Sequence, residues 1–278
     1  MVVGGSVGGL FAANLLADLG WEVDVYERVA DDLASRGAGI GTHDELIQVL
    51  AKLGIAMDER LGVKSGDRIC LDRHGHTVYR IPWGHTMSGW ASVYRPLKAR
   101  FPAERYHFNK TLLSYEETLA GVSAHFADGS TARADLLIGA DGLRSAVRTQ
   151  LYPGLESEYA GYVAWRGTIA ESALPVDLRA WLGGDYWMVL PPGEMFATYA
   201  IPGRNGPASR DWNVVWYRPI LSDDVMRDMC TDDAGRHHGF SMPPPLIRSD
   251  VIRRHHANAR AFLPPQLASL VEHTAAFF

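Results

Sequence analysis

The first 26 residues combine apolar runs with a segment of helical spacing. A short apolar run at 2–3 and a longer one at 21–26 flank a segment, 10–19, whose apolar residues recur at helical spacing. A glycine-rich turn at 4–9 joins the first run to this segment. The order predicts a β-strand, a helix and a second strand, and parallel strands joined in this way are buried on both faces.

Further elements follow from the same patterns. The dipeptide Asp128-Gly129 lies between two short alternating runs and is typical of a hairpin turn. We expect a helix over 44–53, short strands within 68–82, a hairpin of 122–126 and 131–134, and a buried strand over 135–139 that returns to the parallel sheet.

After about residue 155 the chain becomes rich in strand-forming and aromatic residues, as in 186–190 and 213–217. The pattern predicts a mixed α/β (α+β) fold that combines a Rossmann-like domain with a mostly antiparallel β domain. We expect the Rossmann-like domain at 1–67 and 84–155, the β-rich domain at 68–83 and 156–220, and a helical or loop segment at 221–278 leading back toward the first domain.

Composition narrows the class of protein. The chain has 27 Lys plus Arg against 32 Asp plus Glu, a net charge of −5, which argues against a nucleic-acid partner. Two isolated cysteines, Cys70 and Cys230, suit a reducing cytoplasm. No signal peptide is visible, and no apolar run approaches the roughly 20 residues of a membrane span. We therefore expect a cytoplasmic protein with no membrane partner.

The glycine-rich turn carries the first chemistry. Gly4 permits a tight bend, Gly9 permits close helix packing, and Ser6 occupies the second fingerprint position, where glycine is usual. The following helix would present free N–H groups to a pyrophosphate. Glu27, 18 positions beyond Gly9, would accept hydrogen bonds from ribose hydroxyls. The turn therefore predicts a site for FAD or NAD rather than NADP.

A second motif, 139–148, follows the buried strand predicted at 135–139. Asp141 could accept a ribose or backbone hydrogen bond, and Arg144 and Arg148 could face phosphate charge. The alternative is an ordinary helix start capped by Ser145, which the motif alone favours.

Together these motifs resemble the FAD-dependent aromatic hydroxylases of the para-hydroxybenzoate hydroxylase class, the group A flavoprotein monooxygenases. Segment 35–40 is similar to the part of that family that folds over the flavin. Segment 94–97 resembles a helix start whose Arg turns toward the FAD pyrophosphate, and 159–167 and 213–217 look most like the 2,6-dihydroxypyridine 3-hydroxylase branch. The motifs and the resemblance imply FAD contacts at Gly4, Ser6, Gly8, Gly9, Glu27, Arg28, Arg36, Gly37, Ala38, Gly39, Arg95, Asp141, Gly142 and Arg144.

The resemblance also implies an activity, in which NAD(P)H reduces bound FAD and O2 then supplies one oxygen atom to an electron-rich ring. Candidate substrate contacts are Arg166, Trp187, Tyr199 and Trp216, although strand aromatics are more often core residues. No catalytic base can be named. His255 and His256 follow two arginines on a predicted polar helix face, where a metal site is not expected.

Two alternatives stay open. The family has a third motif, a Gly-Asp segment near the flavin ring, which is missing here, and a two-residue first strand and two terminal phenylalanines favour a chain truncated at both ends. Such a fragment could be inactive on its own. A dehydrogenase or reductase of the same fold is a second alternative. The oligomeric state is not determined, and a homodimer is one candidate.

Overall fold

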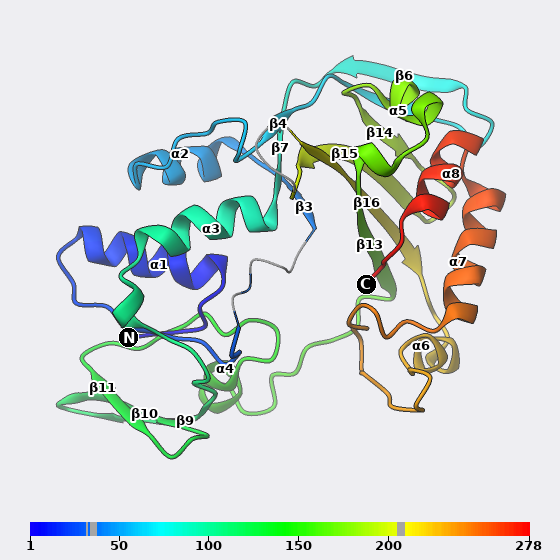
Figure 1. Cartoon of the computed structure of the whole chain (residues 1–278). Helices are drawn as coiled ribbons and strands as arrows, with labels where there is room; N and C mark the ends of the chain where they lie inside the picture. The colour runs from blue at the N-terminus through cyan, green and yellow to red at the C-terminus, as the bar shows by residue number, and fades with distance from the viewer. Residues whose placement is uncertain (32, 34–37, 205–208) are drawn as a thin grey trace. The chain divides into compact units, whose positions relative to one another are not determined.

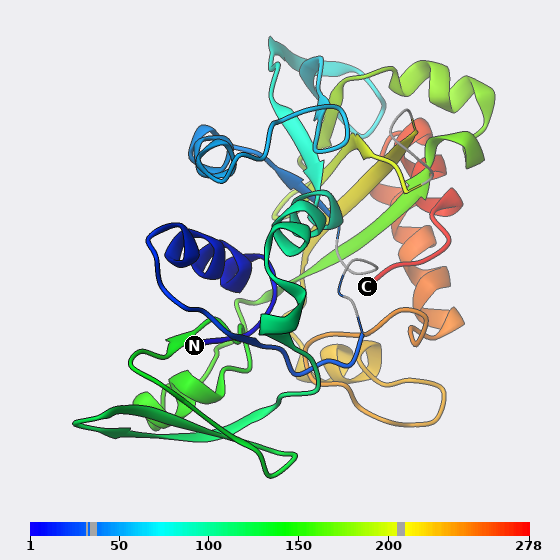
Figure 2. The same cartoon turned by 60° about the vertical axis from the view of Figure 1, so that its left-hand side comes forward.

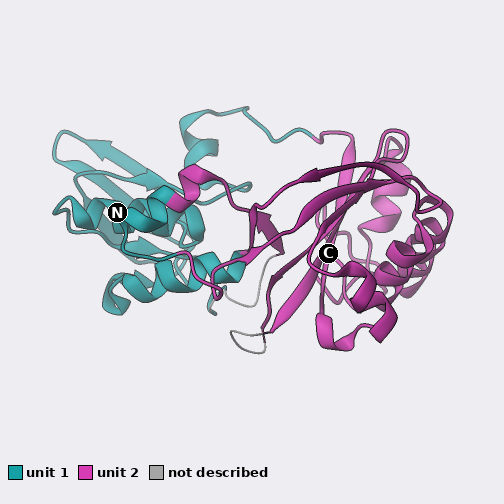
Figure 3. Ribbon diagram, turned by 90° about the horizontal axis from the view of Figure 1, so that it is seen from above, with its two compact units in different colours: residues 1–37, 48–56, 90–158 teal, residues 38–47, 57–89, 159–278 magenta. Residues whose placement is uncertain are grey.

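The computed structural model describes residues 1–31, 33, 38–204 and 209–278 (Figures 1 and 2). The chain divides into two compact units, shown in two colours in Figure 3. Unit 1 comprises residues 1–37, 48–56 and 90–158, and unit 2 comprises residues 38–47, 57–89 and 159–278.

Unit 1 contains a four-stranded parallel sheet in the order β12-β1-β2-β8. Because β1 and β2 are parallel and the helix α1 lies between them in sequence, the predicted βαβ opening is confirmed. Helices α1 and α3 pack side by side (Figure 1). The elements are β1 (Val2–Val3), α1 (Val7–Asp18), β2 (Val25–Tyr26), α3 (Trp90–Arg100), β8 (Tyr106–His107) and β12 (Ile138–Gly139).

The rest of unit 1 is an antiparallel sheet, β11-β10-β9, with a short helix after β12. Strand β10 alternates buried and half-buried positions, and its Val122, Ala124 and Phe126 face the interior. The predicted hairpin is confirmed at β10 and β11. The elements are η2 (Ala103–Arg105), β9 (Leu112–Thr118), β10 (Gly121–Phe126), β11 (Thr131–Ala134) and α4 (Ala146–Leu151); α2 (Asp44–Lys52) has residues in both units.

Unit 2 is built on a six-stranded sheet in the order β13-β16-β15-β14-β5-β6, antiparallel except where β14 runs parallel to β5. Its strands are β5 (Asp67–Leu71), β6 (Thr77–Pro82), β13 (Tyr162–Ala170), β14 (Tyr186–Val189), β15 (Met195–Pro202) and β16 (Arg210–Pro219).

The two faces of this sheet are covered differently. One face, hereafter the helix face, carries Phe196, Trp212 and Trp216, and helices pack on it (Figures 1 and 2). Those helices are α5 (Val176–Leu182), α7 (Ser249–Phe262) and α8 (Pro265–His273). The other, hereafter the cavity face, meets a small sheet of order β3-β7-β4 through Met87, which clusters with Tyr199 and Ile201. The small sheet contains β3 (Gly39–Gly41), β4 (Val63–Lys64) and β7 (Thr86–Gly89).

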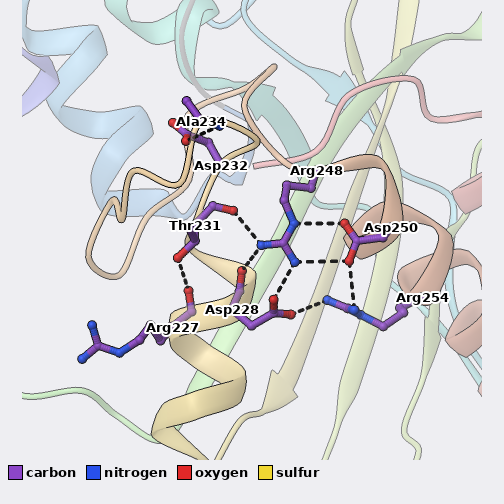
Figure 4. Close-up of polar contacts among 8 residues, drawn as sticks. All are labelled: Arg227, Asp228, Thr231, Asp232, Ala234, Arg248, Asp250 and Arg254. Carbon is purple, nitrogen blue, oxygen red and sulfur yellow. Dashed lines mark hydrogen bonds and ion pairs between the residues drawn. The ribbon is translucent and has the colours of Figure 1, made fainter.

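An ion-pair network ties α6 (Asp223–Met229) to the start of α7 (Figure 4). The guanidinium of Arg248 bonds Asp228 at 2.5 Å and Asp250 at 3.0 Å, and it also donates to the carbonyl of Thr231. Arg254 pairs with both carboxylates. Arg248 lowers the pKa of Asp250 to about 2. The network secures the connection between the helices within unit 2.

Three expectations need correction. Residues 221–278 belong to unit 2, because α7 and α8 bury apolar side chains on its sheet. Residues 38–47, 57–67 and 84–89 also lie in unit 2, because β3 and β4 pair with β7, and residues 156–158 lie in unit 1. His255, predicted on a polar helix face, is buried at 1% exposure and stacks on Trp165 with ring centroids 4.0 Å apart.

Candidate functional site

The glycine-rich turn of unit 1 has the geometry expected of a dinucleotide fingerprint. Gly4 has φ +104°, and a Cβ there would lie 2.2 Å from the carbonyl oxygen of Ala140. A Cβ on Gly9 would lie 1.8 Å from the carbonyl oxygen of Gly4. Glycine is therefore required at both positions, because β1, α1 and the loop after β12 approach one another at backbone distance.

The N-terminus of α1 is available for an anion. Ser6 is the N-cap residue, in extended conformation, yet its side chain makes no capping hydrogen bond. Gly8 is exposed in the first turn, and a Cβ there would meet no atom within 4 Å. Because the first N–H groups of a helix have no intrahelical acceptor, this turn can donate to a pyrophosphate.

Glu27 lies beside the same turn and is buried at 5% exposure. Its Oε2 accepts the N–H of Gly5 at 2.7 Å, and its Oε1 accepts the N–H of Val29 at 3.0 Å. A carboxylate has about four acceptor positions, so these two bonds fix its orientation and leave capacity for ribose hydroxyls. Arg28 is exposed next to it.

The second motif forms the capped helix start that was one of its two alternatives. Asp141 accepts the hydroxyl of Ser145 at 2.5 Å and the N–H of Ala146 at 2.7 Å. Ser145 in turn accepts the N–H of Arg148 at 2.9 Å, while the Arg148 guanidinium donates to the Leu143 carbonyl. Arg148 therefore stabilises the loop between β12 and α4. Gly142, with φ +74°, and Arg144 are exposed in that loop.

The remaining predicted FAD contacts are dispersed. Arg95 is exposed in the middle of α3, which begins at Trp90, so it does not stand at a helix start. The family resemblance had suggested a helix start at segment 94–97, which lies inside α3. Ala38 and Gly39 lie in unit 2. Arg36 and Gly37 lie outside the described residues.

Unit 1 fits the adenosine diphosphate part of FAD. The fit rests on two glycines that a Cβ would disrupt, an uncapped helix N-terminus and a buried, oriented glutamate. The N–H groups of the helix N-terminus would bind a pyrophosphate, and the carboxylate of Glu27 would accept hydrogen bonds from a ribose.

Unit 2 contains a cavity of about 200 Å³ between the cavity face of the six-stranded sheet and the small sheet β3-β7-β4. Arg166 and Tyr199, two of the predicted substrate contacts, both line it. The lining residues are Gly39, Gly41, Thr42, Trp83, His85, Met87, Arg166, Tyr186, Met195, Tyr199, Val215 and Tyr217.

The polar groups of this cavity suit an aromatic ring with anionic oxygen. Arg166 donates to the hydroxyl of Tyr217 at 3.4 Å, and Tyr186 stacks on Tyr199 with centroids 5.2 Å apart. Burial raises the pKa of Tyr199 and of Tyr186 above the ordinary value, so both phenols stay protonated donors at neutral pH. The lining includes a guanidinium and no carboxylate.

Trp187 and Trp216, the other two predicted contacts, lie on the helix face. The indole of Trp187 donates to the carbonyl of Leu182, and that of Trp216 donates to Glu194. Both are buried in the core cluster, because odd and even positions of a strand point to opposite faces. The same parity could have identified Tyr186 and Tyr217, which the sequence argument missed, as partners of Arg166.

The described residues contain neither a membrane-spanning helix nor a metal-ligating cluster. No helix there is long and apolar enough to cross a membrane. Nor does any group of three or more metal-ligating side chains come together within the described ranges.

Comparisons with known proteins identify relatives of this chain. A family model described as "FAD binding domain-like" matches residues 159–278. The chain is 33% identical over 266 residues to a 2,6-dihydroxypyridine 3-monooxygenase of Paenarthrobacter nicotinovorans, covering 95% of this chain and 66% of that protein. It is 29% identical to a 6-hydroxynicotinate 3-monooxygenase of Bordetella bronchiseptica, covering 76% of this chain and 61% of that protein.

A solved structure supports the same relationship. The 2,6-dihydroxypyridine-3-hydroxylase of Arthrobacter nicotinovorans superposes with a TM-score of 0.93 at 32% identity, covering 100% of this chain and 70% of that one. The fold and the two sites define a flavoprotein of the Rossmann type with a β-sheet substrate domain. The chain belongs to the FAD-dependent aromatic hydroxylases, the group A flavoprotein monooxygenases. It spans less than two thirds of the length of the two curated relatives named above.

Proposed function

We propose that this chain provides the FAD-binding and substrate-binding parts of a monooxygenase that hydroxylates a small hydroxylated aromatic or N-heteroaromatic ring with NAD(P)H and O2. The observation that carries the proposal is the cavity of unit 2, where Arg166 meets three buried or half-buried tyrosines. The similarity to enzymes named for hydroxypyridine and hydroxynicotinate substrates supports the choice of ring.

The cofactor would be held by the residues of unit 1. The N–H groups at the start of α1 would bind the pyrophosphate, and Glu27 would accept the ribose hydroxyls. Gly4, Ser6, Gly8, Gly9, Arg28, Ala38, Gly39, Arg95, Asp141, Gly142 and Arg144 remain proposed contacts, as do Arg36 and Gly37. When bound, FAD supplies electron transfer from NAD(P)H and activation of O2.

The substrate would be held by the cavity residues. Arg166 would pair with a ring oxygen and favour its deprotonated form, because a nearby cation lowers the pKa of an acidic hydroxyl. Tyr199 stays protonated and can donate to the same ring. A deprotonated hydroxyl makes the ring more electron-rich and therefore more reactive toward an electrophilic oxygen. Enclosure between two sheets would exclude water from the reaction.

A spectrum and a turnover assay test this function. We expect the chain, or a version with the full length of its relatives, to show flavin absorption near roughly 450 nm after FAD is added. With 2,6-dihydroxypyridine as the probe, NAD(P)H and O2 consumption should match a product heavier by one oxygen atom. If NAD(P)H were oxidised at the same rate with and without 2,6-dihydroxypyridine, and no hydroxylated product formed, the dehydrogenase alternative would be favoured instead.

Two further points belong to the proposal. We place the protein in the cytoplasm, where NAD(P)H is available and where the two cysteines, both free and buried, would stay reduced. A homodimer remains a candidate assembly, which light scattering on the full-length protein would test.

A further inference from the structure

A buried polar side chain of the cavity face, Asn213, contacts strand β3 of the small sheet. Asn213 lies on β16 and is 1% exposed. Its Oδ1 accepts the backbone N–H of Gly39 at 2.7 Å, across 174 positions of sequence. Because the Gly39 N–H is a donor, the Asn213 side-chain atom that faces it must be the amide oxygen rather than the nitrogen.

Close packing accompanies that hydrogen bond. A Cβ added to Gly39 would lie 2.7 Å from Cγ of Asn213 and 2.7 Å from Cε2 of Tyr199. The backbone of β3 therefore rests directly on two neighbouring side chains of the cavity face. Because Gly39 and Gly41 both line the cavity, the position of β3 defines one of its walls.

The other half of the Asn213 amide is unusual. Its Nδ2 is buried and has no hydrogen-bond partner among the described residues. A buried donor without a partner destabilises a fold, and an apolar side chain of similar shape would avoid that cost. Stability alone therefore does not account for asparagine here, whereas the bond to Gly39 does.

We propose that Asn213 is a positioning residue, whose amide oxygen fixes strand β3 as a wall of the substrate cavity. The inference rests on the proposed function, because it takes the cavity to be the substrate site. Substrate affinity and the ordering of β3 then depend on the same hydrogen bond.

Amide hydrogen exchange at Gly39 tests the proposal without activity. Asn213→Leu keeps the volume but removes the acceptor, and we expect the Gly39 amide to exchange about tenfold faster, the factor for one hydrogen bond of ordinary net strength. Asn213→Asp keeps an acceptor and should restore slow exchange. Thr198→Val is a matched control, because it also removes a buried polar group without a partner, here a hydroxyl on the helix face.

Ligand binding supplies the second readout. In the FAD-loaded protein we expect Asn213→Leu to weaken 2,6-dihydroxypyridine binding by about tenfold, with Thr198→Val unchanged. Asn213→Leu should also lower the midpoint of urea unfolding, because it leaves the buried N–H of Gly39 without an acceptor. Recovery of slow exchange and of ring affinity in Asn213→Asp therefore separates positioning from a general structural role.

Unchanged exchange at Gly39 in Asn213→Leu, failure of Asn213→Asp to restore it, or unchanged ligand affinity would each overturn the proposal. A wild-type protein that binds no ring would instead count against the proposed function, and the exchange result would still decide what Asn213 does.

Discussion

The two faces of the six-stranded sheet share strands and alternate residue by residue, but they are built from different chemistry. The helix face presents Phe196, Trp212 and Trp216, whose exposure is zero, to α5, α7 and α8. The cavity face presents Arg166, Tyr199 and Asn213 to a much smaller sheet and an open volume. Tight apolar packing on one face stabilises the sheet, which allows the other face to carry charged and incompletely bonded groups.

This contrast explains why the tryptophans of the substrate domain are poor markers of its site. Trp187 follows Tyr186 directly on β14, and Trp216 precedes Tyr217 directly on β16, yet only the tyrosines line the cavity. Size and aromaticity do not distinguish the two faces, whereas strand parity does.

The largest effect should come from the helix face. Phe196→Ala removes a fully buried ring from the core, and we expect the free energy of unfolding to fall by about 3–5 kcal/mol. Urea unfolding of the wild type and the variant measures this difference. A loss below about 1 kcal/mol would mean that the helix face is not tightly packed.

The next effect should appear in binding rather than in stability. Arg166→Met retains a long side chain but removes the charge, and we expect ring affinity to fall by about 10- to 100-fold, the range for a charged hydrogen bond. Calorimetry with 2,6-dihydroxypyridine measures the affinity. Arg80→Met, at an exposed arginine on β6 outside the cavity lining, is the control and should leave it unchanged. Equal losses in both variants would contradict the assignment of the cavity face.

Acid should act on the helix face through His255. Burial, with Arg218 and His256 nearby, lowers the pKa of His255 to about 3 from its ordinary value of 6.5. The folded protein therefore keeps this ring neutral while the unfolded chain takes up a proton. The contribution of His255 to the free energy of unfolding is therefore fully present above pH 6.5. It is lost as the pH falls from 6.5 toward 3.

Between pH 7 and pH 5 this loss amounts to roughly 2 kcal/mol, at about 1.4 kcal/mol per pH unit below the unfolded pKa. His255→Phe keeps the stacking on Trp165 and should flatten the pH dependence of urea unfolding by that amount. His74→Phe, at an exposed histidine, should not. A His255→Phe variant as acid-sensitive as the wild type would show that this ring is protonated in the fold.

The smallest effect is expected at Tyr199. Tyr199→Phe removes one hydroxyl beside the cavity, and we expect affinity for the ring to fall by about 3- to 10-fold, with stability changed by less than about 1 kcal/mol. The same calorimetric titration and urea unfolding measure both quantities. If the free energy of unfolding fell by more than the free energy of ring binding, Tyr199 would act as a core residue, like those of the helix face.

Local patterns predicted much of the fold. The glycine turn, helix α2 and the hairpin closed by Asp128-Gly129 depend on neighbouring residues, and all three were confirmed. The faces of the large sheet could not be assigned in the same way, because they depend on where α7 and α8 pack. His255 shows the same limit, since its helix looks polar in sequence but its ring lies among Trp165, Trp216 and Phe277.

The candidate sites divide along similar lines. The FAD fingerprint is contiguous, so Gly4, Gly9 and Glu27 could be placed from spacing alone. The cavity instead gathers residues from six strands and the connections between them, and the Asn213–Gly39 bond joins positions 174 apart. Only the parity of Arg166 and Tyr199 offered a signal for it. The helix start expected at segment 94–97 came from the family resemblance, and the structure begins α3 at Trp90 instead.

The most direct test of the central claim is a crystal structure of the FAD-loaded protein with 2,6-dihydroxypyridine bound. We predict ring density in the cavity of unit 2, with a ring oxygen within hydrogen-bond distance of the Arg166 guanidinium and with Trp187 and Trp216 untouched. A ring bound elsewhere, with the cavity of Arg166, Tyr199 and Tyr217 filled only by water, would contradict the account.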